Sequence, residues 1–230
     1  MFPIRDTIRS RSFPIANYGI IALNVLVFLF QTSLSERGFY LFLQWFGLTP
    51  AQFSLFLPLQ WITIFSSMFM HGGWFHLISN MWTLYIFGDN VEDRMGTKRY
   101  VAFYLISGSV AAITHVFSSP ELNVPTVGAS GAVAGVLGAY FLLYPSARVT
   151  TFIPVFFLPW FVDIPAFFYL GIWFFLQVVN GLLVGAAVMS GIAWWAHIGG
   201  FIVGLLLVRL FASRAPAVEV AYHQGEQWPL

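Results

Sequence analysis

Ser130, His197 and Asn80 are the residues of this sequence whose chemistry stands out, because each is a polar side chain in a strongly apolar stretch. A serine hydroxyl becomes a nucleophile when a neighbouring base takes its proton, and histidine is the usual base. The tetrahedral intermediate that follows needs donors directed at its oxyanion. His76 and Asn80 are four residues apart, so on a helix they share one face. With the backbone N–H of Ser130, they could supply those donors.

The composition decides what kind of protein must hold these groups. Hydrophobic residues make up 59% of the 230 residues and charged residues only 8%, whereas a soluble domain carries about 25% charged residues. The chain is therefore predicted to be an integral membrane protein, with the lipid bilayer as its surroundings. The net charge of +1 gives no reason to expect nucleic acid as a partner. The absence of cysteine excludes disulfides, thiolate catalysis and cysteine-ligated metals.

Apolar segments long enough to cross a bilayer set the expected fold. A span needs about 20 mainly apolar residues, and six segments qualify: about 17–35, 72–91, 99–118, 126–145, 166–187 and 193–212. Two further apolar stretches, 53–69 and 151–166, contain prolines, which disfavour a continuous helix, so we expect loops there. The predicted fold is an all-α membrane protein, a bundle of six transmembrane helices with a long interfacial first loop over about residues 36–71.

The basic residues orient this bundle. With six spans and the N-terminus inside, nine of the ten lysines and arginines fall on the cytoplasmic side and only Arg37 falls outside. We expect a cytoplasmic segment at 1–16, a single six-span domain at 17–213 and a polar cytoplasmic tail at 214–230. Both termini would be cytoplasmic. The sequence lacks a Ser/Arg-rich extension typical of transit peptides, which favours a prokaryotic cell (inner) membrane.

This orientation brings the polar residues to one depth. Spans two, four and six all run from outside to inside, which places Asn80, His76 and His71, then Ser130, then His197 in the outer half of the membrane. Polar groups inside a membrane are expensive and by default indicate a function. No aspartate or glutamate lies in the outer half of any predicted span. The sequence therefore predicts a Ser130–His197 dyad rather than a triad.

Glycines provide the close approach that such a dyad requires. One stripe of span four contains Gly128, Gly131, Gly135 and Gly138, and span six contains Gly200 and Gly204. Small residues at this spacing let helix backbones pack closely. We therefore expect spans four and six to be in direct contact.

These motifs resemble those of the rhomboid family of intramembrane serine proteases. The resemblance rests on GxSG at 128–131, AHxGG at 196–200, the set His71, His76 and Asn80, and the Gly88/Glu92 region, and it extends over about residues 15–212. It implies that Ser130 is the nucleophile and His197 the general base, with His76 and Asn80 binding the oxyanion. It also implies transmembrane protein substrates with a single span, cleaved near the outer membrane surface, and no cofactor. Two positions differ from many members: Ile62 follows Trp61 where arginine is common, and Ala134 stands where an aromatic packs on the catalytic histidine.

Other interpretations remain open at this point. A catalytically inactive rhomboid-like protein that binds membrane proteins or acts in quality control is one, and a small transporter is another. Ser130 could serve packing alone, and His71 could be structural. His115 and His223 are expected to be incidental, and Glu92 to form an ion pair or helix cap. The α/β-hydrolase motif is excluded because Ala132 replaces its second glycine, and no HExxH zinc motif is present.

Overall fold

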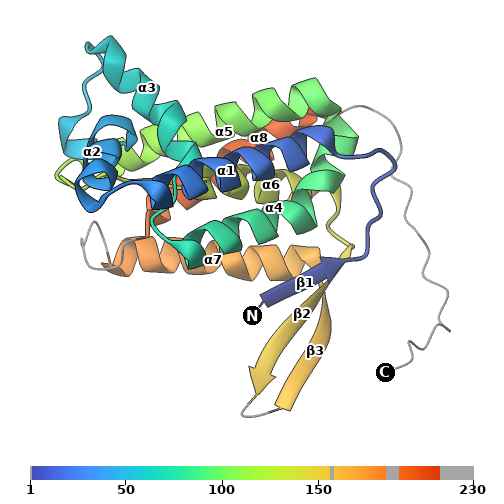
Figure 1. Ribbon diagram of the computed structural model, residues 1–230. Coiled ribbons are helices and arrows are strands. Elements are labelled where there is room, and N and C mark those ends of the chain that lie inside the picture. The colour runs from blue at the N-terminus through green and yellow to red at the C-terminus, as the bar shows by residue number, and fades with distance from the viewer. Residues whose placement is uncertain (1, 156–157, 185–191, 213–230) are drawn as a thin grey trace, which may run out of the picture.

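The computed structural model describes residues 2–155, 158–184 and 192–212 (Figure 1). Helices dominate the fold, and one small sheet adjoins them. The elements in chain order are β1 (Phe2–Asp6), α1 (Ile15–Ser33), α2 (Glu36–Phe46), η1 (Pro50–Gln52), α3 (Pro58–Ser66), η2 (Ser67–Phe69), α4 (Trp74–Met95), α5 (Thr97–Ser118), α6 (Ser130–Leu143), β2 (Arg148–Val155), β3 (Leu158–Pro165), α7 (Ala166–Val184) and α8 (Trp194–Phe211).

Each of the six predicted spans contains a helix. Among the described residues, four helices are long and apolar enough to cross a membrane, namely α1, α5, α7 and α8. The helix α4 has 22 residues but ends in a charged turn, and α6 is apolar but has only 14 residues. That all six cross the bilayer therefore stays a prediction.

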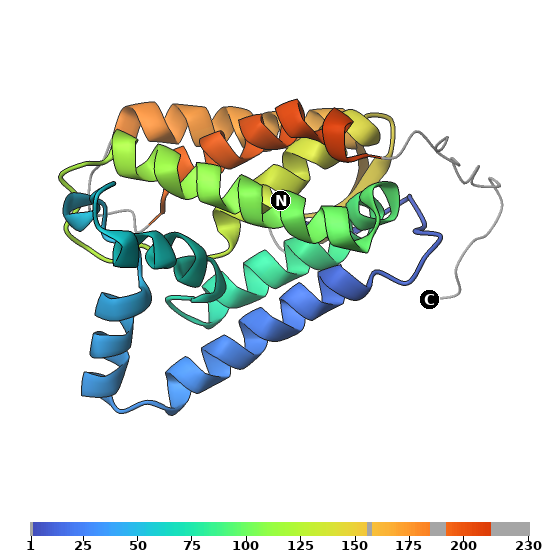
Figure 2. The same ribbon diagram turned by 90° about the horizontal axis from the view of Figure 1, so that it is seen from above.

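The helix that carries Ser130 lies at the centre of the bundle. Every residue from Gly131 to Tyr140 of α6 is buried, and α6 packs against α4, α5, α7 and α8. Figure 2 shows α1 and α7 on opposite edges of the bundle with α6 between them. A helix buried on all sides must be apolar all round, which explains why this segment has only small and aliphatic residues in its first turns.

The described residues are mostly helical, as expected for an all-α fold, but Arg148–Val155 and Leu158–Pro165 form strands where a loop was expected. The sheet has the order β1-β2-β3 and both pairings are antiparallel, with Arg148 opposite Pro165 and Val155 opposite Leu158. β-Branched residues such as Val149, Thr150 and Thr151 favour strands. Prolines that excluded a helix are accommodated at strand ends and on edge strands. In Figure 1 the sheet extends from one end of the bundle, beside the start of α7.

The first loop contains more helix than the sequence suggested. The expected loop at 53–69 contains α3 and η2, and α3 begins at Pro58. Proline is well tolerated in the first turn of a helix, where its missing N–H would have no partner anyway. Glu36–Phe46 forms a further helix, α2, capped by the Ser35 hydroxyl, which accepts from the Gly38 N–H at 3.2 Å. The expected tail at 214–230, with His223, lies outside the described residues.

Candidate functional site

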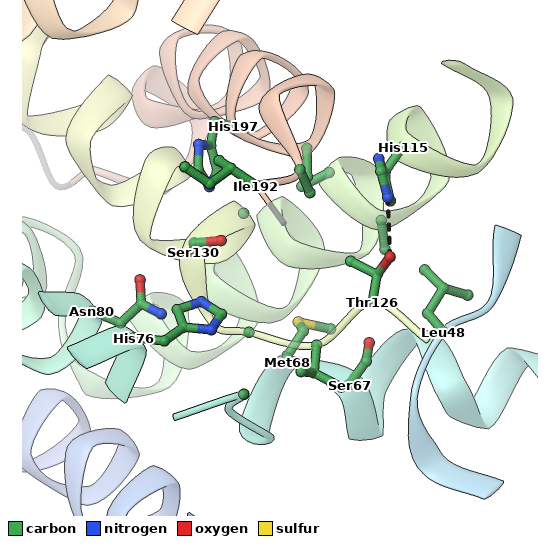
Figure 3. A pocket seen from close by; sticks show the side chains of 18 of the residues that line it. Leu48, Ser67, Met68, His76, Asn80, His115, Thr126, Ser130, Ile192 and His197 are labelled. Carbon is green, nitrogen blue, oxygen red and sulfur yellow. Dashed lines mark hydrogen bonds between the residues drawn. The ribbon is translucent and has the colours of Figure 1, made fainter. Parts of the chain in front are cut away.

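A cavity of about 830 Å³ brings the predicted site residues together. Its lining includes Ser130 from α6, His197 from α8, and His76 and Asn80 from α4 (Figure 3). Three helices that are far apart in the sequence thus contribute side chains to the lining of one cavity. The clustering was expected from the spans, while the catalytic roles of these residues stay predictions.

Ser130 is the first residue of α6, which corrects the predicted start of this helix at residue 126. The preceding segment is extended: Thr126 pairs with Leu48, and Gly128 has a φ of 138°, a backbone conformation that other residues rarely adopt. The Gly128 N–H donates to the Ser67 carbonyl at 2.9 Å, which fixes the turn. Because the first N–H groups of a helix have no intrahelical acceptor, this end of α6 presents free donors and a partial positive charge at Ser130.

His197 lies in the first turn of α8 and lines the same cavity. Figure 3 shows its ring and the Ser130 hydroxyl on adjacent walls, and in the described part of the chain no hydrogen bond joins them. Catalytic hydrogen bonds are often long in the absence of substrate, so this geometry does not exclude the pair. The Nδ1 atom of His197 lies 2.8 Å from Oε1 of Gln177 on α7.

Gln177 is a site residue that sequence reasoning missed. It is 6% exposed and, with Asn180, is one of two polar residues in the apolar sequence of α7. An intramembrane polar residue is a signal for function, but its sequence position alone does not reveal the contact with His197.

His76 and Asn80 form the wall opposite the start of α6. The His76 ring packs on Gly128 so closely that a Cβ at residue 128 would lie 2.6 Å from its Cε1 and Nε2 atoms. Asn80 is 6% exposed, and its Nδ2 donor has no hydrogen-bond partner among the described residues. A buried amide without an acceptor is unfavourable unless something else supplies one. An oxyanion bound in the cavity would be such an acceptor.

His71 lies behind this wall rather than in it. It is fully buried, and its ring meets the His76 ring at a centroid distance of 5.1 Å in an edge-to-face arrangement. Its backbone N–H donates to Oε1 of Gln31 at 3.1 Å, and the Gln31 amide donates back to the His71 carbonyl at 3.2 Å. The structural role left open for His71 fits these contacts, since it supports His76 from behind.

The glycines of α6 and α8 make direct contact. A Cβ on Gly200 would collide with the Gly131 carbonyl, and one on Gly204 would collide with the Gly135 carbonyl. Gly131 also packs on Ala111 of α5, where an added Cβ would come within 2.6 Å. The expected close contact between these two segments is therefore present, and it places Ser130 and His197 on neighbouring helices.

Ala134 and Ile62 are the two positions that differ from many family members, and the structure shows the surroundings of Ala134 and of Trp61, which precedes Ile62. Ala134 is fully buried beneath Gly200, where a Cβ on Gly200 would lie 3.2 Å from its own Cβ. Aromatic contact with His197 comes instead from Trp173 and Trp194, at centroid distances of 6.0 Å and 6.3 Å. Trp61 donates from its ring to the Leu55 carbonyl at 3.2 Å, within the first loop.

Two further polar residues have structural partners. His115, expected to be incidental, lines the cavity and lies 3.1 Å from the Thr126 hydroxyl, so it helps to hold the segment before Ser130. Glu92 caps the start of α1, accepting from the backbone N–H groups of Ala16 at 3.0 Å and Asn17 at 2.7 Å. The expectation of a cap at Glu92 is confirmed. Across residues 2–155, 158–184 and 192–212, no cluster of three potential metal ligands occurs.

The fold and the cavity define a helical membrane protein with a serine, a histidine and an asparagine gathered inside its bundle. Comparison with known protein families identifies the family to which this membrane protein belongs. A family model described as "Rhomboid domain" matches residues 58–214, more than half of the chain, so the chain belongs to the rhomboid family.

Similar proteins carry rhomboid names. The chain is 31% identical to "Rhomboid protein 1, mitochondrial" of Saccharomyces cerevisiae over 196 residues, which is 82% of this chain and 51% of that protein. It is 31% identical to "Presenilin-associated rhomboid-like protein, mitochondrial" of Homo sapiens over 60% of this chain and 35% of the relative. "RHOMBOID-like protein 4" of Arabidopsis thaliana is 32% identical over 63% of this chain and 32% of its own length. The chain thus spans about half, or less, of these relatives. Two of these three names say mitochondrial, so these relatives do not support the expected prokaryotic inner membrane.

Proposed function

We propose that the chain is an intramembrane serine endopeptidase that cleaves single-span membrane proteins near the outer membrane face, with both of its own termini in the cytoplasm. One observation carries the proposal: Ser130, His197, His76 and Asn80 line a single cavity. Membership of the rhomboid family supports the same reaction class.

In the first half of the reaction, Ser130 Oγ attacks the scissile carbonyl carbon. Nε2 of His197 accepts the hydroxyl proton and then gives it to the leaving amine as the peptide bond breaks, which leaves an acyl-enzyme. In the second half, His197 takes a proton from water, the hydroxide attacks the ester, and the proton returns to Ser130 as the acid product leaves. No cofactor takes part.

The oxyanion of both tetrahedral intermediates would be bound opposite the serine. Its donors are the unpartnered Nδ2 of Asn80, the His76 ring and the backbone N–H of Ser130 at the start of α6. Donors that are already fixed in position stabilise developing charge without reorganising during the reaction.

The experiment is cleavage of a single-span reporter in proteoliposomes. We expect the wild type to cleave it, Ser130→Ala and His197→Ala to lose cleavage, and the matched control Ser109→Ala, on α5 outside the cavity, to retain it. Equal cleavage by wild type and both site variants would overturn the dyad. A folded wild type that binds the reporter without cutting it would instead favour the inactive, binding relative.

A further inference from the structure

The carboxamide of Gln177 has only one orientation that satisfies its neighbours. Its Nε2 lies 3.2 Å from the backbone carbonyl of Trp173, and its Oε1 lies 2.8 Å from Nδ1 of His197. A carbonyl oxygen can only accept, so the NH₂ group must face Trp173. The amide oxygen, which also can only accept, must then face His197. The hydrogen bond therefore requires a proton on Nδ1.

This requirement fixes the tautomer of His197. A neutral imidazole with its proton on Nδ1 carries its lone pair on Nε2. That is the protonation state in which Nε2 can take the proton of a serine hydroxyl. In serine proteases with a triad, an aspartate holds the histidine in this tautomer and orientation. No carboxylate fills that place here, because the only described side chain within hydrogen-bond distance of Nδ1 is the amide of Gln177.

We infer that Gln177 is the positioning residue of the catalytic histidine, holding the His197 ring with Nε2 directed at Ser130. The inference rests on the proposed serine-protease function and adds a third side chain to the dyad. A neutral amide suits this location, since an uncompensated carboxylate in an apolar span is strongly disfavoured.

The ring contacts come from the same helix. Trp173 lies four residues before Gln177, so the two side chains share one face of α7, and the Trp173 ring lies 6.0 Å from the His197 ring. Ala134 on α6 has no aromatic group to offer. The position of α7 therefore sets both the hydrogen bond and the aromatic contact of the base, although neither reacting group belongs to that helix.

Gln177→Leu tests the inference. Leucine has a similar volume but no hydrogen-bond acceptor, so the Nδ1–H group of His197 loses its partner. We expect kcat for the reporter to fall by about 10- to 100-fold, by analogy with the loss of partners that orient metal-bound histidines, with KM within about twofold. The rate of covalent labelling of Ser130 by a small fluorophosphonate should fall by the same factor. That probe needs no transmembrane substrate, so it separates alignment of the base from substrate entry.

Gln177→Glu is the conservative variant with an acceptor at the same place. It should label faster than Gln177→Leu, because the side chain again offers an acceptor to Nδ1–H of His197. The matched control is Asn180→Leu on the same helix, whose amide donates to the Leu176 carbonyl and which does not line the cavity. It should label at the wild-type rate.

Labelling of Gln177→Leu at the wild-type rate would overturn the inference, as would labelling of Gln177→Glu no faster than that of Gln177→Leu. If Gln177→Leu fails to fold, as judged by its thermal unfolding, Gln177→Met replaces it with the same expectation. A wild type that neither cleaves nor labels would refute the proposed function. A wild type that does both, together with an unaffected Gln177→Leu, would refute the role of Gln177 alone.

Discussion

Gly200 on α8 lies directly against the backbone carbonyl of Gly131 on α6, the residue that follows Ser130. His197 lies three residues before Gly200, on the same helix. One close contact between the two helices is therefore made one turn or less from both proposed reacting groups. We therefore expect substitution at this contact to affect both helix packing and the proposed catalytic geometry.

Gly200→Ala should damage both stability and activity. Its Cβ would overlap the Gly131 carbonyl, which is backbone and cannot rotate away, so α8 must shift. We expect a loss of about 1–3 kcal/mol of stability, as for overpacked sites, measured by thermal unfolding in detergent, and a loss of fluorophosphonate labelling. The control is Gly19→Ala on α1, where an added Cβ meets nothing within 4 Å. Wild-type labelling by Gly200→Ala would contradict the link between packing and reactivity.

Asn80→Ala should slow the reaction more than it weakens binding. Removing one donor from an oxyanion site lowers kcat by about 10²- to 10³-fold, and KM should change little because the charge develops only in the transition state. Reporter cleavage over a range of substrate concentrations separates the two constants. Thr83→Ala, on the same helix but outside the cavity, should behave as wild type. A rise in KM with kcat unchanged would assign Asn80 to substrate binding.

Much of this architecture could be predicted because a membrane strongly limits the length and polarity of the segments that cross it. The length of the apolar segments predicted a helix in each span. The spacing of glycines in spans four and six predicted that these two spans are in contact. Polar residues in apolar stretches identified Ser130, His197 and Asn80, which meet at one cavity. Each of these inferences follows from a local pattern in the sequence.

The parts that were missed depend on contacts between distant segments. Proline excluded a helix at 151–166 correctly, but only pairing with residues 2–6 and 148–155 reveals the sheet. The pairing of Thr126 with Leu48 and the positive φ of Gly128 delay the start of α6 to Ser130. Gln177 looks like an isolated polar residue until the packing of α7 on α8 brings it to His197.

Glu92→Ala should destabilise the first helix. Both carboxylate oxygens accept from α1, at the N–H groups of Ala16 and Asn17, and Oε1 also accepts from the Thr97 hydroxyl at 2.9 Å. Hydrogen bonds to a charged group contribute about 1.5–3 kcal/mol, so a loss of about 2 kcal/mol or more is expected in thermal unfolding. Glu121→Ala, at an exposed position before α6, should have no such effect. Equal unfolding temperatures for wild type and Glu92→Ala would show that the cap is dispensable.

Asp6 makes the docking of β1 sensitive to pH. Its carboxylate accepts hydrogen bonds from the Tyr140 hydroxyl of α6 and from Nδ2 of Asn90, the latter at 2.8 Å. Burial raises the pKa of Asp6 from 3.8 to about 7, and the nearby charge of Asp89 adds to the rise. The docked strand therefore binds a proton that the undocked strand releases. Stability from this group is fully present below pH 4 and is lost as the pH rises to about 7.

Asp6→Asn should remove this dependence, because an amide keeps the polar contacts but does not titrate. Across pH 4 to 7, the unfolding temperature of the wild type should fall relative to that of Asp6→Asn, measured in the same detergent at each pH. Asp163→Asn changes an exposed carboxylate of the same sheet, which the Thr150 hydroxyl meets at 2.7 Å, and should leave the wild-type dependence in place. Parallel curves for wild type and Asp6→Asn would mean that Asp6 is ionised in the docked strand throughout this range.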